Sequence, residues 1–349
     1  MIDAQVPQLI LESFLFTAGF KQFATKQNLI VQPFGFRDRF TLIRGLAPYL
    51  ASLIGKNRYE RELSSVIAIM IIPLLILALI QGLLEYLPVS SEGQILLVGV
   101  NVFYFDPNFL LSLVFWLHLG TAFTVMVFYH RAIFGSLYLR IHPPREEPND
   151  SEPAKLLGPL FVFVLVGTMG TVVVAMPLYF FLKSWVTFLM GSFVTLGIGF
   201  LLIVTGVVLF FQRGVKGDRK LADISLREAL VIGLLQGIAV LPGISRSAMT
   251  LTWLLVRGVN REEALRLSFL LSVPATVGVV ALDFIVEGAT LVVPLFILLL
   301  LLLVAFFTGL VTLTLLRYYA IRVPWWIFCL VMGIIVVVLT FPTIVFVIP

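Results

Sequence analysis

Six long apolar runs, each about the length of a membrane-spanning helix, follow one another along the chain. They cover residues 109–128, 156–182, 187–211, 267–282, 290–316 and 325–346. Their hydrophobicity is continuous, whereas a transmembrane β-strand alternates apolar and polar residues over about 10 positions. The pattern therefore predicts an all-α polytopic membrane protein with six transmembrane helices.

Two other apolar stretches are interrupted by polar residues, glycine and proline. Residues 80–97 read IQGLLEYLPVSSEGQILL, and residues 234–250 read LLQGIAVLPGISRSAMT. A Gln-Gly pair, a Leu-Pro pair and two serines follow in the same order in both. The separation is 155 residues at Gln-Gly and 154 at Leu-Pro. Discontinuous helices at corresponding positions of two halves indicate a binding site where the halves meet.

The loops at residues 131–155 and 212–228 are rich in Lys and Arg, which indicates that they are cytoplasmic. Both flanks of the second interrupted stretch are then cytoplasmic, so we expect a re-entrant helical hairpin there. If the first stretch is also a re-entrant hairpin, its orientation is opposite and both its flanks lie outside, which puts the basic N-terminal extension on the outer side unless another segment crosses. The opposite orientation predicts an inverted repeat with halves at residues 64–211 and 212–349. Residues 1–63 form an N-terminal extension that is either interfacial or poorly ordered.

The composition agrees with a membrane protein and excludes several other classes. Hydrophobic residues make up 60% of the 349 residues and charged ones 12%, against about 25% charged residues in a soluble domain. The net charge of +5 is explained by the cytoplasmic loops, so the expected surroundings are membrane lipids and not nucleic acid. The single cysteine, Cys329, excludes a disulfide framework and a cysteine metal site.

Both interrupted stretches have a proline followed by serines, which is typical of a helix start because a serine hydroxyl caps free backbone N–H groups. We therefore expect helices to restart near Ser91 and near Ser245, with their positive ends inside the membrane. Such ends bind anions, and phosphate above all. Arg246 adds a guanidinium that matches phosphate oxygens, although an internal ion pair with Glu85 is the alternative.

Two carboxylates, Glu85 and Glu92, lie beside this expected anion site. Together with a diphosphate they predict a site for a divalent cation, Mg²⁺ or Ca²⁺, unless one of them acts as a base. Glu92 has a second explanation, because an acid in the first turn of a helix is favourable there anyway. His118 lies within a span, where we expect it to form a hydrogen bond between helices, with a direct catalytic role as the alternative. Four serines are candidates for capping, phosphate binding or nucleophilic attack, with Glu85 as the nearest base: Ser90, Ser91, Ser245 and Ser247.

The motifs QGLLEYLPVSSEGQ and LPGISRS closely resemble the two signature motifs of the undecaprenyl-diphosphatase family. The segments FWLHLGT and RLSFLLSVPA add to the resemblance, which covers residues 70–349. Members of this family are membrane phosphatases that dephosphorylate a C55 polyprenyl diphosphate. The resemblance implies six spanning helices, two re-entrant hairpins, a divalent cation, and a site that faces the outer side of the cytoplasmic membrane.

The resemblance also implies roles for single residues. Glu85 matches the glutamate implicated in metal or water activation, and one of Ser90 and Ser91 matches the proposed nucleophile. Arg246 matches the arginine of the diphosphate-binding segment, so we expect it to be catalytic. The resemblance further implies that side chains of both motifs contact the substrate: Gln81, Ser245 and Ser247.

The chain departs from the family where it has Glu92-Gly93-Gln94 in place of the common Ser-Gly-His. We expect Gln94 to contact the substrate, but it cannot act as a general base, so more of the work falls on Glu85 and Glu92. Ala248 replaces the usual glycine after SRS. The SSEGQ variant indicates a divergent, archaeal branch, in which the lipid carrier would be of the dolichyl type.

These observations predict a hydrolase that removes the terminal phosphate of a long-chain polyprenyl diphosphate, of undecaprenyl or dolichyl type, and so recycles a glycan lipid carrier. One alternative is a transporter or flippase of a polyprenyl phosphate, because inverted repeats with broken helices are typical of transporters. A catalytically inactive lipid-phosphate binder is the other. The sequence leaves open whether the chain forms a homodimer.

Overall fold

The computed structural model describes residues 58–133, 152–188, 191–211, 217–288, 291–319 and 324–347, and side chains over somewhat shorter ranges that begin at residue 71. Apart from one bridge between Arg219 and Val259, their regular secondary structure is helical. Most of the expected N-terminal extension, residues 1–63, lies outside the described residues. The elements are α4 (Arg58–Leu84), α5 (Ser91–Asn101), α6 (Pro107–Phe128), α8 (Glu152–Phe188), α9 (Gly191–Phe211), η1 (Leu221–Asp223), α10 (Leu226–Ile238), α11 (Arg246–Val256), α12 (Arg261–Val286), α13 (Leu295–Tyr319) and α14 (Trp325–Val347).

Six of the described helices are long and apolar enough to cross a membrane. They belong to α6, α8, α9, α12, α13 and α14, and each overlaps one of the six predicted spans. The prediction of an all-α polytopic membrane protein is therefore confirmed. The spans are Pro107–Phe128, Gly158–Trp185, Ser192–Phe211, Arg261–Val286, Leu295–Leu316 and Trp325–Pro342.

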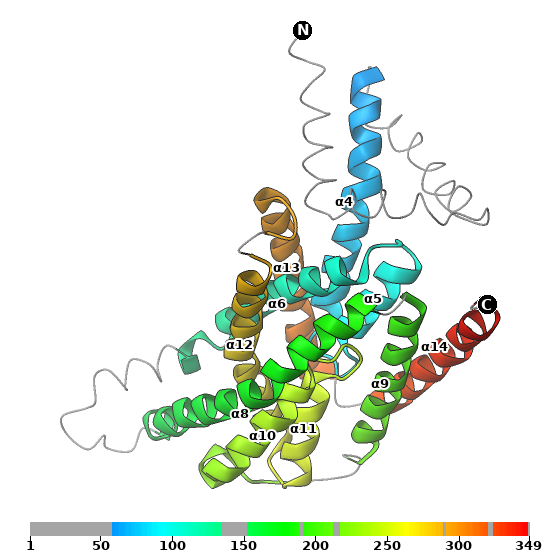
Figure 1. Cartoon of the computed structure of the whole chain (residues 1–349). Coiled ribbons are helices and arrows are strands. Elements are labelled where there is room, and N and C mark those ends of the chain that lie inside the picture. Colours follow the sequence, from blue (N-terminus) through cyan, green and yellow to red (C-terminus); the bar gives the residue numbers. More distant parts are fainter. Residues whose placement is uncertain are drawn as a thin grey trace.

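Helices far apart in the sequence pack in pairs around the short helices α5 and α11 (Figure 1). The main pairs are α9 with α14, α8 with α10, and α4 with α13. Small residues allow the backbones to approach closely. A Cβ on Gly233 of α10 would lie only 1.9 Å from the carbonyl oxygen of Gly167 in α8. Likewise, a Cβ on Gly82 of α4 would lie 2.7 Å from the carbonyl oxygen of Ala305 in α13.

Most buried apolar side chains form two large clusters with a polar layer between them, and a third, small cluster consists of Val89, Leu209, Ala248 and Cys329. In α6, apolar residues of the segment 110–117 belong to one cluster and Val125 to the other, with His118 buried between them. The helices α8 and α12 run through the two clusters in the opposite order, with the buried residues Thr171 and Thr276 between them. All three polar residues lie near the middle of their spans. The polar layer is therefore at mid-depth in the bundle.

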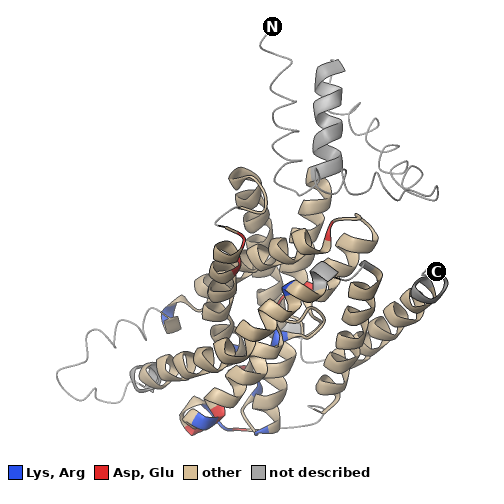
Figure 2. Cartoon of the chain, viewed as in Figure 1, with Lys and Arg blue, Asp and Glu red and all other residues tan. Residues whose placement is uncertain are grey.

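Charged side chains gather at the end of the bundle where α10 begins and α11 ends (Figure 2). There Arg219 pairs with Glu228 at 3.0 Å and donates to the carbonyl oxygen of Arg257 at 2.8 Å. Hydrogen bonding from Arg219 lowers the pKa of Glu228 to about 2, so this carboxylate stays ionised at neutral pH. These contacts join the first turn of α10 to the C-terminal end of α11.

We expect Gly233→Ala to destabilise the protein by about 1–3 kcal/mol, because the added methyl group meets the backbone of α8. The thermal midpoint in detergent measures this effect. Gly278→Ala in α12 is the matched control, since a Cβ there meets no atom within 4 Å. Equal midpoints for the two variants would contradict the close packing of α10 on α8.

Candidate active site

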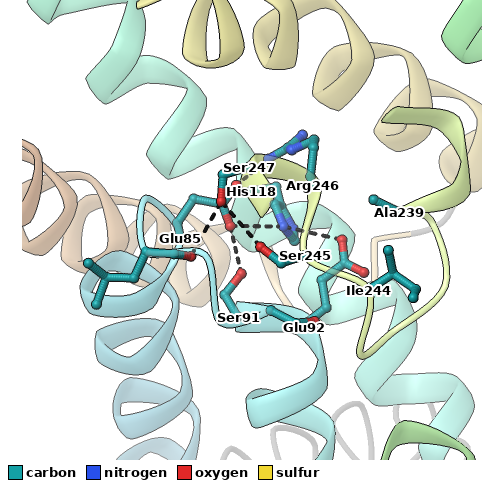
Figure 3. Close-up of a pocket in the computed structure, with 11 residues that line it drawn as sticks. Glu85, Ser91, Glu92, His118, Ala239, Ile244, Ser245, Arg246 and Ser247 are labelled. Atoms are coloured by element: carbon teal, nitrogen blue, oxygen red, sulfur yellow. Dashed lines mark hydrogen bonds and ion pairs between the residues drawn. The ribbon is translucent and has the colours of Figure 1, made fainter. Parts of the chain in front are cut away.

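A small cavity lies in the polar layer, where the turns after α4 and α10 meet α6 (Figure 3). Most of its wall is polar, although the surrounding helices are apolar. It is lined by Glu85, Leu87, Ser90, Ser91, Glu92, His118, Ala239, Ile244, Ser245, Arg246 and Ser247. Both interrupted motifs therefore contribute to one cavity, as their repetition in the sequence predicts.

The first turn is held by Ser90, the N-cap of α5. Its hydroxyl oxygen accepts hydrogen bonds from the backbone N–H of Gly93 at 3.3 Å and of Gly243 at 3.0 Å. Ser90 has φ 57°, a left-handed conformation that a residue other than glycine adopts only at a cost of about 1–3 kcal/mol. The bond to Gly243 joins the first turn to the second, so Ser90 organises both.

The second turn is held by Ser245, the N-cap of α11. Its hydroxyl oxygen accepts from the N–H of Ala248 at 3.3 Å, and its own N–H donates to Thr205 of α9 at 3.1 Å. Gly243 has φ 108° and lies against α9, where a Cβ would be 2.8 Å from the carbonyl oxygen of Ile198. The predicted helix restarts at Ser91 and beside Ser245 are confirmed.

Glu85 is the hydrogen-bonding centre of the cavity. Its Oε1 pairs with the guanidinium of Arg246 across the two turns. Its Oε2 accepts from Ser91 Oγ at 2.6 Å and lies 3.1 Å from Nε2 of His118. Gln81, one turn earlier in α4, donates its Nε2 to the same oxygen at 2.8 Å. Both carboxylate oxygens are thus engaged by side chains from four helices, α4, α5, α6 and α11.

Arg246 has partners on one side and the cavity on the other. Besides Glu85, its guanidinium donates to Thr276 Oγ1 of α12 at 2.7 Å. The internal ion pair raised by the sequence is therefore present, and the same side chain also lines the cavity. A guanidinium has five N–H donors, so pairing with one carboxylate does not exhaust its capacity to bind phosphate.

His118 also lines the cavity, although the sequence favours a hydrogen bond between helices there over a catalytic role. Its Nε2 lies 3.1 Å from Glu85 and 3.3 Å from Glu92, and its Nδ1 lies 2.7 Å from the carbonyl oxygen of Val114. Figure 3 shows the ring between the two carboxylates. An ionisable side chain in the middle of an apolar span is itself a sign of function, and the segment FWLHLGT carries that sign.

The remaining predicted residues differ in their distance from the cavity. Ser247 lines it, with its Oγ 3.2 Å from Ser245 Oγ. Gln81 is fully buried and stands behind Glu85, so it supports the carboxylate and does not line the cavity. Gln94 is also buried and does not line the cavity, and its Nε2 has no hydrogen-bond partner among the described residues.

The predicted cation was assigned to Glu85 and Glu92, and their arrangement does not fit a bridging metal ion. Both oxygens of Glu85 face donors, and the ring of His118 occupies the place between the two carboxylates. Among the described residues there is no group of three or more His, Cys, Asp and Glu side chains that could hold a metal ion. We derive no step through a metal held by these two residues.

The sequence pattern of the bacitracin resistance protein BacA family matches residues 74–338. The chain belongs to this family. The chain is 36% identical to the undecaprenyl-diphosphatase of Methanothrix thermoacetophila over 266 residues, which is 76% of this chain and 95% of the relative. For the undecaprenyl-diphosphatase of Haloarcula marismortui the identity is 35% over 260 residues, 74% of this chain and 93% of the relative. The resemblance of the two motifs to the undecaprenyl-diphosphatase family is therefore confirmed, with archaeal relatives among the similar proteins.

Bacteria also have similar BacA-family proteins. The undecaprenyl-diphosphatase of Carboxydothermus hydrogenoformans is 37% identical over 210 residues, which is 60% of this chain and 71% of the relative. The BacA pattern covers both interrupted motifs and the α6 segment that carries His118. The cavity therefore lies wholly within the part of the chain that this family shares.

We expect Ser90→Ala to lower stability by about 1–2 kcal/mol, because two buried N–H groups lose their acceptor. Ser247→Ala is the control, since the contacts of its hydroxyl are with Ser245 Oγ and the carbonyl oxygen of Leu87, and no backbone N–H loses its acceptor. The thermal midpoints of both variants in detergent check this. If Ser247→Ala lowered the midpoint as much as Ser90→Ala, the bridging role of Ser90 would be wrong.

Proposed function

We propose that this protein hydrolyses the terminal phosphate of a long-chain polyprenyl diphosphate and thereby recycles a glycan lipid carrier. The observation that carries the proposal is the cavity at mid-depth, in which a serine, a carboxylate and an arginine converge. The relatives' name, undecaprenyl-diphosphatase, agrees with this chemistry. The function is that of a multi-pass membrane hydrolase, with its substrate supplied by the membrane.

Ser91 is the serine with the geometry of a nucleophile. Its hydroxyl donates to Glu85 at 2.6 Å, and Glu85 is in turn oriented by Arg246, which is the arrangement of nucleophile, base and orienting group. Ser90 is engaged as a cap by two N–H groups. Ser91 Oγ attacks the terminal phosphorus while its proton passes to Glu85. The bond to the bridging oxygen breaks, the lipid monophosphate leaves, and water then releases the phosphate from the serine.

The head group is held by positive charge from both motifs. Arg246 offers N–H donors to the phosphate oxygens, and the N-termini of α5 and α11 add free backbone N–H groups and the positive ends of two helix dipoles. Arg246 also stabilises the charge that builds up on the oxygens during the transfer. The prenyl tail lies in the bilayer, along the exposed apolar side chains of the spans.

The short helices form two re-entrant hairpins related by an inverted repeat. In support, the caps Ser90 and Ser245 are 155 residues apart, and each precedes a helix of 11 residues. The helix packing also repeats: α4, which precedes the first short helix, packs on α13, and α10, which precedes the second, packs on α8. The helices α9 and α14 pack on each other. The contact of Arg219 with both Glu228 and Arg257 brings the ends of the α10–α11 pair together at the charge-rich end.

The charge-rich end faces the cytoplasm, and the site is reached from the outer side of the cytoplasmic membrane. This follows from the excess of Lys and Arg at one end, since such residues are retained on the cytoplasmic side. From residue 71 onward, where side chains are described, the opposite end has few charged residues: Asp106, Lys183, Asp283 and Glu287.

The divalent cation stays a prediction. Because the carboxylates are engaged, Mg²⁺ or Ca²⁺ would enter on the diphosphate, since Mg²⁺ is often bound largely through substrate phosphates.

Transport of a polyprenyl phosphate is the second candidate function, favoured by the paired broken helices. The hydrogen bond from Ser91 to Glu85 favours hydrolysis, because mere binding or passage of an anion needs no base beside a hydroxyl.

The activity is tested with purified protein and undecaprenyl or dolichyl diphosphate, with Mg²⁺, with Ca²⁺ and with a chelator. We expect phosphate release by the wild type, and a loss of about 100-fold or more in Arg246→Ala and in Glu85→Ala, because each removes a charge that acts on the transition state. Arg266→Ala is the control, since Arg266 forms an ion pair with Glu263 outside the cavity. Near-normal rates in both site variants would contradict the proposed site.

The orientation is tested by labelling single cysteines in whole cells. The native Cys329 is fully buried, so the background is low. We expect a membrane-impermeant thiol reagent to label Val102→Cys, at an exposed position after α5, and not Ala222→Cys, at an exposed position of η1. Labelling of Ala222→Cys alone would show that the charge-rich end faces outward.

A further inference from the structure

We propose that His118 relays a proton between Glu85 and Glu92 during hydrolysis, so that Glu92 serves as the acid for the leaving group and the base for water. The inference rests on the proposed phosphatase activity and deepens it. Four side chains form a continuous series. Ser91 Oγ lies 2.6 Å from Glu85 Oε2, and the same oxygen lies 3.1 Å from His118 Nε2. This nitrogen lies 3.3 Å from Glu92 Oε1.

The hydrogen positions follow from the partners of the two ring nitrogens. The Nδ1 of His118 lies 2.7 Å from the carbonyl oxygen of Val114, which can only accept, so Nδ1 carries a hydrogen. The Nε2 faces two carboxylate oxygens. Either Nε2 also carries a hydrogen, or one carboxyl group does. In both cases a single mobile proton lies between Glu85 and Glu92.

A purely structural histidine has no need of this arrangement. One hydrogen bond from Nδ1 already fixes the ring in α6, yet Nε2 is placed between two acids in the middle of a span. Buried ionisable groups at this depth are expensive and are retained for function. The comparison within the chain is His130, whose ring also has Nδ1 near a carbonyl oxygen, at 2.9 Å, but which is exposed at the end of α6 and does not line the cavity.

Glu92 is suited to be the far end of the relay. It lines the cavity, and its second oxygen, Oε2, is buried without a hydrogen-bond partner among the described residues. Such an oxygen is costly to bury unless a ligand or a proton completes it. A half-turn of the carboxyl group exchanges its two oxygens, which carries a proton received from His118 to the cavity side.

Protons are conserved over the two half-reactions. As Ser91 Oγ bonds to phosphorus, the hydroxyl proton passes to Glu85. The Nε2 proton of His118 passes to Glu92. The proton on Glu85 then moves to Nε2 of His118 and replaces the one that was given up. Glu92 then protonates the bridging oxygen, which leaves on the lipid monophosphate. When water attacks the phosphoserine, Glu92 takes a proton from it, and the reverse relay returns one to Ser91.

The test uses His118→Gln, which keeps a hydrogen-bonding amide but cannot pass a proton, and Glu92→Gln, with His130→Gln as the matched control. Phosphate release from the lipid diphosphate gives kcat and KM for each. We expect kcat to fall about 100-fold or more in both site variants, the scale of lost acid–base catalysis, with KM nearly unchanged. The double variant should be no slower than the slower single variant, because residues that act as a unit are not additive. His130→Gln should match the wild type.

A rescue experiment separates catalysis from folding. His118→Ala leaves a space for imidazole, and added imidazole should restore part of the lost kcat if the ring carries a proton. If His118→Gln proves unstable in thermal unfolding, Glu92→Gln tests the same relay from its other end. A normal kcat in both glutamine variants, or a change in KM alone, would overturn the relay and leave the phosphatase intact. No phosphate release by the wild type would instead overturn the proposed function itself.

Discussion

The ion pair between Glu85 and Arg246 is the interaction on which the rest of this structure depends. It joins two chain segments 161 residues apart, at a depth where the surroundings of the bundle are apolar. A charge at such a depth persists only when it is partnered, and removing one partner leaves the other uncompensated. The polar layer follows from this need, since Gln81 and Thr276 each supply a further hydrogen bond to one member of the pair.

The two motifs divide their work between architecture and chemistry. In each, the serine at the N-cap holds backbone N–H groups, and the next residue presents a functional side chain, Ser91 in one and Arg246 in the other. Ser90 also bonds to Gly243, so the two turns are fixed relative to each other. The result is a preorganised cavity, which is what transition-state stabilisation by fixed charges requires.

The sequence was sufficient for the spans, for the two interruptions and for the pairing of the motifs, because these depend on local hydrophobicity and on helix-start chemistry. The ion pair between Glu85 and Arg246 was one of two predicted roles for the arginine, the other being phosphate binding. For His118 a catalytic role was only the weaker alternative, because that role depends on how α6 packs against both turns, which no spacing in the sequence reveals. Gln94 was expected at the substrate, but the α5 helix buries it away from the cavity wall.

The division of the site between two halves has a consequence for how the chain is made. The first half carries Glu85, Glu92 and His118, and the second carries Arg246, so the ion pair between Glu85 and Arg246 cannot form within either half. During synthesis, α4 to α6 emerge well before α10 and α11. Until the later segment arrives, Glu85 lacks its arginine, and His118 is the partner that the first half itself offers to both acids. Completion of the cavity is therefore also the event that allows the first half to settle at its final depth in the bilayer.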